Sequence, residues 1–265
     1  MTDIPSLDLV RLRLVDRVAT VTLNRPDRRN ALSTPLLRQL VAALAWCREQ
    51  EEARVVVLTG AGDRAFCAGA DLGSFDDGSG ELERHAERHL LVEVFQALPE
   101  LGKPVIGRVN GHALAGGFGL ACACDLLIAV EAATFGTPEI NVGVWPAIIQ
   151  AVLARNLPRK PLLEMVLLGG RWSAARMREL GLLNRVVATQ DELTAATDEL
   201  AARLASLPAA VVKLGRDSFY RQQDMEYRAA LDYLQAQLSL VSLTDDAREG
   251  TRAFLEKRPP RFTGR

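Results

Sequence analysis

The run Arg54 to Thr59, RVVVLT, constrains the fold more than any other stretch, because it is the strongest buried-strand signal in the chain. A β-hairpin is predicted before it, since residues 10–15 and 18–23 alternate apolar with polar side chains around Asp16-Arg17. Helical patterns separate the predicted strands. Strands that alternate with helices need crossover connections, so we expect an α/β fold with a mainly parallel sheet.

The predicted elements divide the chain into two regions. Further strands are predicted at 104–109, 126–130 and 185–187, and helices are predicted from Thr34-Pro35 and over Glu81 to Leu98. From about Glu192 the strand signals end, and residues 192–207, 209–221 and 226–242 have helical periodicity. We therefore expect a core of residues 1–191 and a helical oligomerisation region of residues 192–265. Such a region packs on the body of its own chain or on another subunit, so a homo-oligomer is predicted.

Composition excludes several classes of partner. The 265 residues carry a net charge of −1, which provides no field for nucleic acid or for an anionic membrane. The start, MTDIPSLDLV, lacks a signal-peptide pattern, and no apolar segment is long enough to cross a bilayer, so the expected location is the cytoplasm. Cys47, Cys67, Cys122 and Cys124 lie in apolar contexts and are predicted to be small buried residues rather than disulfide or zinc partners.

Three familiar motifs do not fit. Gly60 to Ala65 matches a loose dinucleotide-binding pattern, but the helix that should follow at once is interrupted. His85 and His89 have a zinc-like spacing without a third ligand, and a solvated helix face explains them better. The sequence has no G-x-S-x-G serine-hydrolase elbow. We expect neither a bound metal nor a separate cofactor.

Two glycine-rich loops present backbone rather than side chains. In NGHALAGGFGLACACD, Asn110 to Asp125, a helix that begins at Gly116 and Gly117 leaves their N–H groups without intrahelical acceptors, at the positive end of the helix dipole. Taken alone, this loop is explained better by close packing of a helix on a sheet. The second loop, Gly60 to Leu72, offers another free N–H near Gly69 and Ala70. Two backbone donors that converge on one oxygen form an oxyanion hole.

Six motifs in register resemble the enoyl-CoA hydratase/isomerase (crotonase) family. They are NRPDRRNAL from Asn24, AFCAGADL, NGHALAGG, FGTPEI from Phe135, GLLNRVV from Gly181 and the terminal AFLEKRPPRF. The resemblance implies a spiral of ββα units, a C-terminal helical trimerisation region, and trimers that often pair to hexamers. It also implies an acyl-CoA thioester as substrate, whose coenzyme A is part of the substrate and not a cofactor.

The resemblance places the oxyanion hole on the backbone N–H groups of Ala70 and Gly116, with Gly117 beside it. Family hydratases hold water between two glutamates, but here the first of these positions is Gly119. The second is Glu139, which lies in an apolar stretch where burial raises a carboxyl pKa toward that of a general base. A third position that holds a carboxylate in some relatives is Ala147.

A single carboxylate opposite an oxyanion hole can move a proton from one carbon to another, so we expect double-bond isomerisation of an enoyl-CoA. Hydration is the nearest alternative, with Glu139 activating water alone or with help from Asp71, Asp76 or Asp77. Decarboxylation, thioester hydrolysis and binding without catalysis also remain open, because a fold does not fix a reaction.

The remaining predicted contacts concern coenzyme A and the acyl chain. Arg28 and Arg29 suit phosphate groups, since arginine binds phosphate through paired donors. Phe254 and Lys257 resemble tail residues that reach the coenzyme A of a neighbouring subunit. The other residues expected to line the substrate site are Ala68, Gly69, Asp71, Leu72 and Trp145. Asp71 is also suited to a structural hydrogen bond, and Leu91 and Phe95 are suited to the core.

Overall fold

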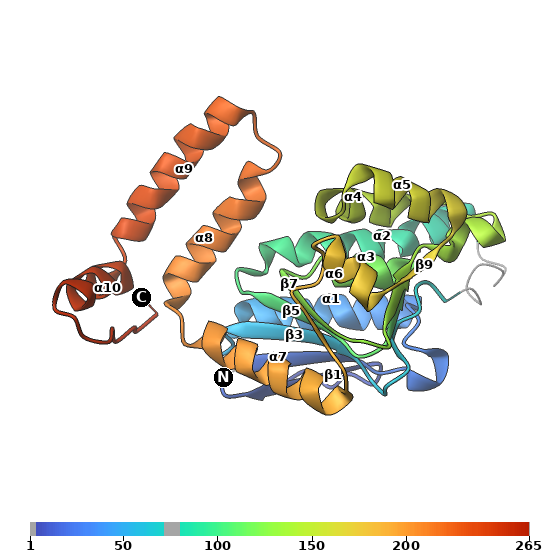
Figure 1. Cartoon of the computed structure of the whole chain (residues 1–265), viewed down its shortest axis with the longest axis horizontal. Helices are drawn as coiled ribbons and strands as arrows, with labels where there is room; N and C mark the ends of the chain where they lie inside the picture. The colour runs from blue at the N-terminus through green and yellow to red at the C-terminus, as the bar shows by residue number, and fades with distance from the viewer. Residues whose placement is uncertain (1–3, 72–79, 265) are drawn as a thin grey trace.

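Two β-sheets organise the chain in the computed structural model, which describes residues 4–71 and 80–264 (Figure 1). The larger sheet has six strands in the order β1-β2-β3-β5-β7-β10. These are β1 (Val10–Val15), β2 (Val18–Leu23), β3 (Val55–Gly60), β5 (Val105–Val109), β7 (Leu126–Val130) and β10 (Arg185–Val187). The predicted hairpin is confirmed as the antiparallel pair β1–β2, and the other neighbours in this sheet run parallel.

Helices cover both faces of the larger sheet. The ten helices are α1 (Thr34–Glu49), α2 (Glu81–Ala97), α3 (Gly116–Cys122), α4 (Ala147–Asn156), α5 (Arg159–Leu168), α6 (Ala174–Glu179), α7 (Gln190–Ala205), α8 (Ala209–Gln222), α9 (Tyr227–Ser242) and α10 (Asp245–Leu255), counted over the described ranges. Val56 and Leu58 of β3 belong to the main core cluster, whereas Val55 and Val57 pack with Ala201 of α7. The continuous apolar run of β3 follows from this burial on both faces.

The smaller sheet consists of four strands that were not predicted. They are β4 (Ala65–Cys67), β6 (His112–Leu114), β8 (Thr134–Gly136) and β9 (Arg171–Ser173), in that spatial order. The first three each follow a strand of the larger sheet and precede a helical segment, which produces the expected succession of ββα units. After β8 that segment is the 3₁₀ helix η4 (Pro138–Val142), and two others, η1 (Pro26–Arg28) and η3 (Pro99–Leu101), connect elements elsewhere.

One helix start differs from the prediction. Ser33, not Thr34, caps α1, because its hydroxyl accepts a hydrogen bond from the Leu36 amide at 3.4 Å, and Thr34 is already helical. Pro35 follows in the first turn, where its missing N–H costs nothing. The predicted helix is therefore correct, with its cap one residue earlier.

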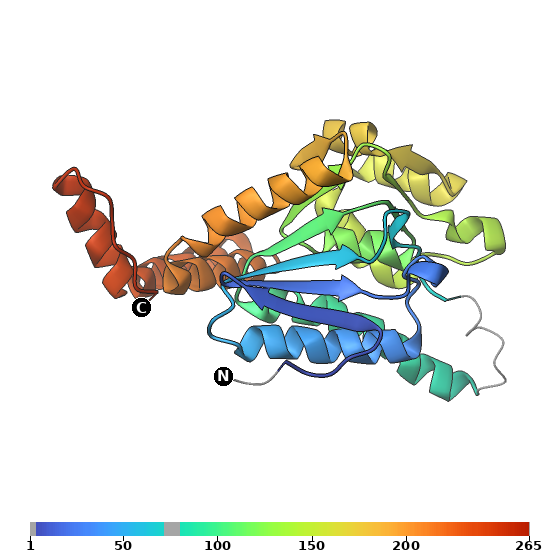
Figure 2. The same cartoon turned by 90° about the horizontal axis from the view of Figure 1, so that it is seen from below.

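The C-terminal helices differ in their relation to the core. Although α7 begins near the predicted boundary at residue 192, it packs on the larger sheet. In contrast, α8, α9 and α10 project from the core as a separate layer (Figures 1 and 2). α10 was predicted only as a tail; its start is capped by Thr244, whose hydroxyl accepts from the Ala247 amide at 3.1 Å.

The four cysteines are buried, as predicted. Burial raises the pKa of Cys67 to about 12, so this thiol stays protonated at neutral pH. In the described ranges we find no helix whose length and apolar character would let it cross a membrane.

Candidate active site

Three neighbouring parallel strands end at the same edge of the smaller sheet. β4 pairs with β6, and β6 pairs with β8. The segments that leave these ends are Ala68 to Ala70, Ala115 to Gly117 and Thr137 to Glu139. Ligands of open α/β sheets bind beyond the carboxyl ends of the strands. The topology therefore gathers both glycine loops and the predicted acid at one edge.

The two glycine loops touch backbone to backbone. Gly69 has a φ of +94°, and a Cβ added to it would lie 2.5 Å from the Ala115 Cβ and 2.9 Å from the Leu114 carbonyl oxygen. A Cβ added to Gly117 would lie 2.3 Å from the carbonyl oxygen of Cys67. Only glycine fits at these two positions, so the sequence of the loops is dictated by their contact.

The N–H groups of Ala70 and Gly116 are free of protein acceptors. Leu32 bridges Ala70 in parallel fashion, donating to the Gly69 carbonyl at 2.8 Å and accepting from the Asp71 amide at 3.1 Å. This pattern turns the N–H of Ala70 away from Leu32. Gly116 is the first residue of α3, where an N–H lacks an intrahelical partner. Across the described residues, neither N–H donates a hydrogen bond to protein.

Two buried asparagines hold the first loop, and sequence reasoning missed both roles. The Asn30 amide donates to the carbonyl oxygens of Ala61 at 3.0 Å and Ala65 at 2.8 Å. The Asn110 amide donates to the Gly62 carbonyl at 2.7 Å and its oxygen accepts from the Gly60 amide at 3.1 Å. Both side chains are fully buried, so they fix the backbone that leads into β4. The only signal in the sequence was an asparagine at the edge of each motif.

Glu139 lies in η4, immediately after the end of β8, and is half-buried. Its Oε2 atom is buried and has no hydrogen-bond partner within the described residues. Burial raises the pKa of the Glu139 carboxyl, and its own backbone N–H partly offsets this effect. A carboxylate of raised pKa without a protein partner is suited to accept and return a proton.

The position of the missing second glutamate is closed. A Cβ added to Gly119 would lie 2.6 Å from Cγ2 of Ile149 and 3.0 Å from Cζ of Phe95. Leu91 borders the same region, since its Cδ2 would be 3.8 Å from a Cβ on Gly116. Apolar side chains of α2 and α4 therefore occupy the space beside α3. Leu91 and Phe95 are partly buried and pack against the core, as expected.

The residues predicted to contact coenzyme A lie beside the first loop. Arg28 and Arg29 are exposed, and the Arg29 carbonyl accepts from the Ala68 amide at 3.0 Å. No side-chain bond of either guanidinium is found in the described ranges. Asp71 has a visible structural role, because its carboxylate pairs with Arg25 at 2.9 Å. Its contact with a substrate stays a prediction.

The other residues predicted to contact the substrate are Trp145, Phe254, Lys257 and Leu72. Trp145 is 42% exposed, and its indole N–H donates to the Gln150 side chain at 2.9 Å. Phe254 and Lys257 lie at the end of α10, apart from the core of the same chain (Figure 1). Leu72, Asp76 and Asp77 lie outside the described residues.

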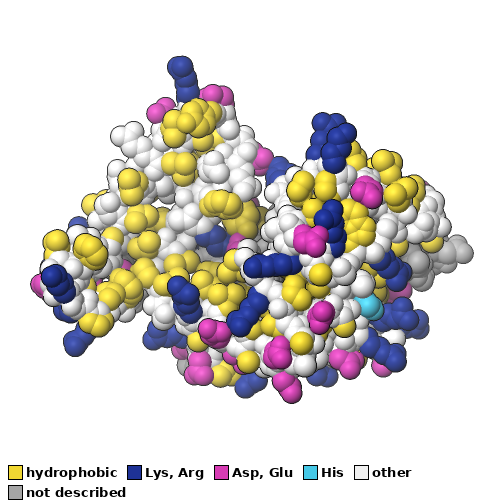
Figure 3. All heavy atoms as spheres, viewed as in Figure 1, with side chains coloured by type: hydrophobic (Ala, Val, Ile, Leu, Met, Phe, Trp, Pro, Cys, Tyr) yellow, Lys and Arg dark blue, Asp and Glu magenta, His cyan; other side chains and the backbone are white. Residues whose placement is uncertain are grey.

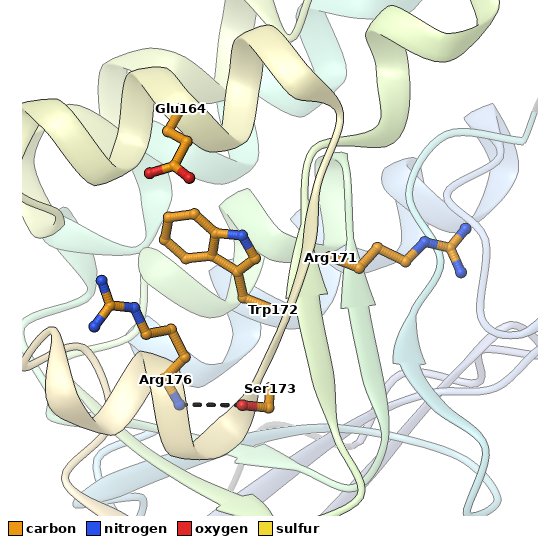
Figure 4. A pocket seen from close by; sticks show the side chains of 5 residues that line it. All are labelled: Glu164, Arg171, Trp172, Ser173 and Arg176. Atoms are coloured by element: carbon orange, nitrogen blue, oxygen red, sulfur yellow. Dashed lines mark hydrogen bonds between the residues drawn. The ribbon is translucent and has the colours of Figure 1, made fainter.

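A separate cleft of about 380 Å³ lies between α5, β9 and α6 (Figure 4). Its lining residues are Glu164, Arg171, Trp172, Ser173 and Arg176. The Arg176 guanidinium lies 5.7 Å from the centroid of the Trp172 ring, a cation–π contact. None of the residues predicted for the active site lines this cleft.

Comparisons with known proteins show the family of the chain. The family model described as enoyl-CoA hydratase/isomerase matches residues 14–265. "Enoyl-CoA hydratase domain-containing protein 3, mitochondrial" of Mus musculus is 34% identical over 254 residues, 95% of this chain and 83% of that protein. "2,3-Dehydroadipyl-CoA hydratase" of Escherichia coli (strain K12) is 34% identical over 94% of this chain and 96% of its own.

Solved structures extend the likeness to three dimensions. The crystal structure of an enoyl-CoA hydratase from Mycobacterium smegmatis matches with a TM-score of 0.93 at 36% identity and covers 96% of this chain and 99% of that chain. The match includes the helical C-terminal region as well as the sheets. The chain therefore belongs to the enoyl-CoA hydratase/isomerase family.

Proposed function

We propose that this enzyme isomerises the double bond of an enoyl-CoA thioester. The N–H groups of Ala70 and Gly116 stabilise the enolate oxygen, and Glu139 removes a proton from one carbon and returns it to another. Preorganised amide donors suit this task, because they stabilise charge where it develops without rearranging during the reaction. Coenzyme A enters as part of the substrate.

One observation carries this proposal. Glu139 has a buried oxygen without a protein partner and a raised pKa, while Ile149 and Phe95 fill the direction in which a side chain at Gly119 would project. A reaction that needs one carboxylate matches this site better than one that needs two. The family membership supports an acyl-CoA substrate.

The test is the conversion of 3-enoyl-CoA to conjugated 2-enoyl-CoA by the purified chain. We expect turnover by the natural protein and a loss of about 100-fold or more in kcat for Glu139→Gln, since a positioned acid/base contributes that much. Glu164→Gln is the matched control, because Glu164 is an exposed glutamate on α5, the helix packed against η4, and should keep full activity. Full activity of Glu139→Gln would remove the assigned base.

Hydration of 2-enoyl-CoA is the second candidate. The relative named 2,3-dehydroadipyl-CoA hydratase favours it. In that case Glu139 activates water without the second glutamate. Hydration of 2-enoyl-CoA with no isomerisation of 3-enoyl-CoA would favour hydration over isomerisation as the function.

Substrate binding and assembly complete the proposal. Arg28 and Arg29 bind the phosphates of coenzyme A, supported by their exposed guanidinium groups beside the first loop. Phe254 and Lys257 contact coenzyme A from a neighbouring subunit of a homo-oligomer, supported by their position away from the site of their own chain (Figure 1).

A further inference from the structure

A second buried oxygen without a partner lies two residues before Glu139. Thr137 is 0% exposed, and its Oγ1 atom has no hydrogen-bond partner within the described residues. A buried hydroxyl left without a partner destabilises the folded protein. Native proteins keep such groups only rarely, so each one needs an explanation.

The place of Thr137 in the fold makes the missing bond more notable. Thr137 is the residue that precedes the first turn of η4, where a threonine side chain ordinarily accepts a hydrogen bond from an amide of that turn. Here it makes no such bond. Its backbone has a φ of −122°, which any residue adopts, so backbone strain does not explain the choice of threonine.

Glu139 lies in the first turn of η4, two residues after Thr137, and its Oε2 atom is likewise buried without a partner in the described part of the chain. The backbone N–H of Glu139 lowers the pKa of the Glu139 carboxyl, and this N–H belongs to the first turn of η4, which Thr137 precedes. The two unpartnered oxygens therefore belong to residues of one short stretch of backbone. A hydroxyl supplies both a donor and an acceptor, a carboxylate supplies only acceptors, and one water molecule satisfies both.

We propose that Thr137 is a positioning residue for Glu139, and that the Thr137 hydroxyl and the Glu139 Oε2 atom hold one buried water between them. The water donates one hydrogen bond to the carboxylate and forms a second hydrogen bond with the hydroxyl. These two bonds fix the orientation of the acid. This inference rests on the proposed function, in which Glu139 is the acid/base.

The hydrogen bond from this water predicts a measurable effect on pH dependence. A hydrogen bond to the charged form of a carboxyl lowers its pKa, so its loss raises the pKa. Because Glu139 acts when it is deprotonated, the acid limb of kcat/KM lies at its pKa and moves to higher pH when the bond is lost. Burial and the Glu139 backbone N–H are the causes that shift the pKa of this carboxyl. The charged residues of the adjacent α5, Arg159, Lys160 and Glu164, are not among these causes.

The experiment compares three variants of Thr137 in the full-length protein. Thr137→Val keeps the shape and removes the hydroxyl; we expect its acid limb to shift upward by roughly half to one pH unit, with kcat lowered more than KM is changed. Thr137→Ser keeps a hydroxyl and should retain the natural profile. If the valine variant fails to fold, Thr137→Ala makes the same test without a β-branched side chain.

Thr134→Val is the matched control on the same strand. The Thr134 hydroxyl is paired with the His112 ring at 2.9 Å, so its removal should lower the melting temperature and leave the acid limb in place. A natural acid limb in Thr137→Val, or its loss in Thr137→Ser, would overturn the inference. If Glu139→Gln loses activity while Thr137→Val keeps the natural limb, this inference alone fails; if Glu139→Gln stays active, the proposed function fails.

Discussion

Single residues at this site are selected mainly by what their backbone must do. Gly69 combines a positive φ with a contact that leaves no room for a Cβ, and the N–H of the next residue, Ala70, has no acceptor among residues 4–71 and 80–264. The conformation of Gly69 therefore sets the direction of the Ala70 amide. This is a requirement on geometry, and no side chain at Ala70 is needed to meet it.

We expect Gly69→Ala to lose both stability and activity. The positive φ alone costs an alanine about 1–2 kcal/mol, and the approach to Ala115 and Leu114 forces the two loops apart. Displacement of one oxyanion donor should lower kcat on the order of 100-fold. Urea denaturation and the isomerase assay measure the two effects.

Gly143→Ala provides the comparison for this variant. Gly143 also has a positive φ, +74°, but a Cβ there meets nothing within 4 Å. Gly143→Ala should lower the free energy of unfolding only by the cost of a positive φ, because the added Cβ clashes with nothing. The Ala70 amide should stay in place in this variant. Equal losses of activity in the two variants would contradict a special role for the Gly69 contact.

The sequence revealed these residues unequally. The glycines and Glu139 stand in contiguous motifs, so the resemblance of these motifs to the family was enough to select them as candidates. The roles of Asn30 and Ile149 depend on partners about thirty residues away, Ala61 and Ala65 in one case and Gly119 in the other. No local pattern records such a contact, so the burial of the Asn30 side chain was not predicted.

At the scale of elements, length decided what was predictable. Five of the strands of the larger sheet and the longer helices have enough residues for a hydrophobic period to appear, and the exception is β10, which was predicted although it has three residues. The strands β4, β6, β8 and β9 have three residues each, which is too short for alternation to be recognised. Yet the carboxyl ends of β4, β6 and β8 position the whole candidate site, so its assembly was predictable from the family resemblance and not from periodicity.

The junction between the core and the helical layer depends on one buried cluster. Arg216 of α8 donates to the Asp125 carboxylate at 2.8 Å and to the carbonyl oxygens of Leu98 and Pro99 at 2.7 and 2.8 Å. Tyr220 donates its hydroxyl to the same carboxylate, and burial raises the pKa of this phenol. The Arg216 side chain is only 8% exposed, so its charge depends on these partners.

We expect Arg216→Met to destabilise the protein by about 3 kcal/mol, because it leaves the Asp125 carboxylate, which is 18% exposed, without its cationic partner. Hydrogen exchange should become faster along α8 before it changes in the larger sheet. Denaturation in urea measures the total loss, and exchange followed by mass spectrometry locates it.

Arg155→Met tests whether burial is the reason. Arg155 also pairs with an aspartate, Asp224, at 2.9 Å, but both side chains are more than half exposed. Exposed ion pairs contribute about 0–1 kcal/mol, so this variant should unfold nearly as the natural protein does. Similar losses in the two variants would show that the Arg216 cluster does not anchor the layer.

For the whole molecule, the outstanding feature is the apolar surface of the projecting helices. Figure 3 shows hydrophobic side chains over α8 to α10 on the viewed face. From α8 to α10, the large hydrophobic residues that are at least half exposed are Phe219, Tyr227, Leu231, Leu238, Leu243, Phe254 and Leu255. A monomer that kept such a layer uncovered would expose an unusually large apolar area. Other copies of the chain are the proposed cover.

We expect size-exclusion chromatography with light scattering to give a mass of three or six chains rather than 28.9 kDa. Leu238→Glu combined with Phe254→Glu places charges on the exposed faces of α9 and α10, so the mass should fall toward that of one chain. Leu168→Glu is the control, because Leu168 is 71% exposed but lies on α5 of the core. If Phe254 and Lys257 complete the coenzyme A site of a neighbour, activity should fall with the mass; a fully active single chain would contradict that assembly.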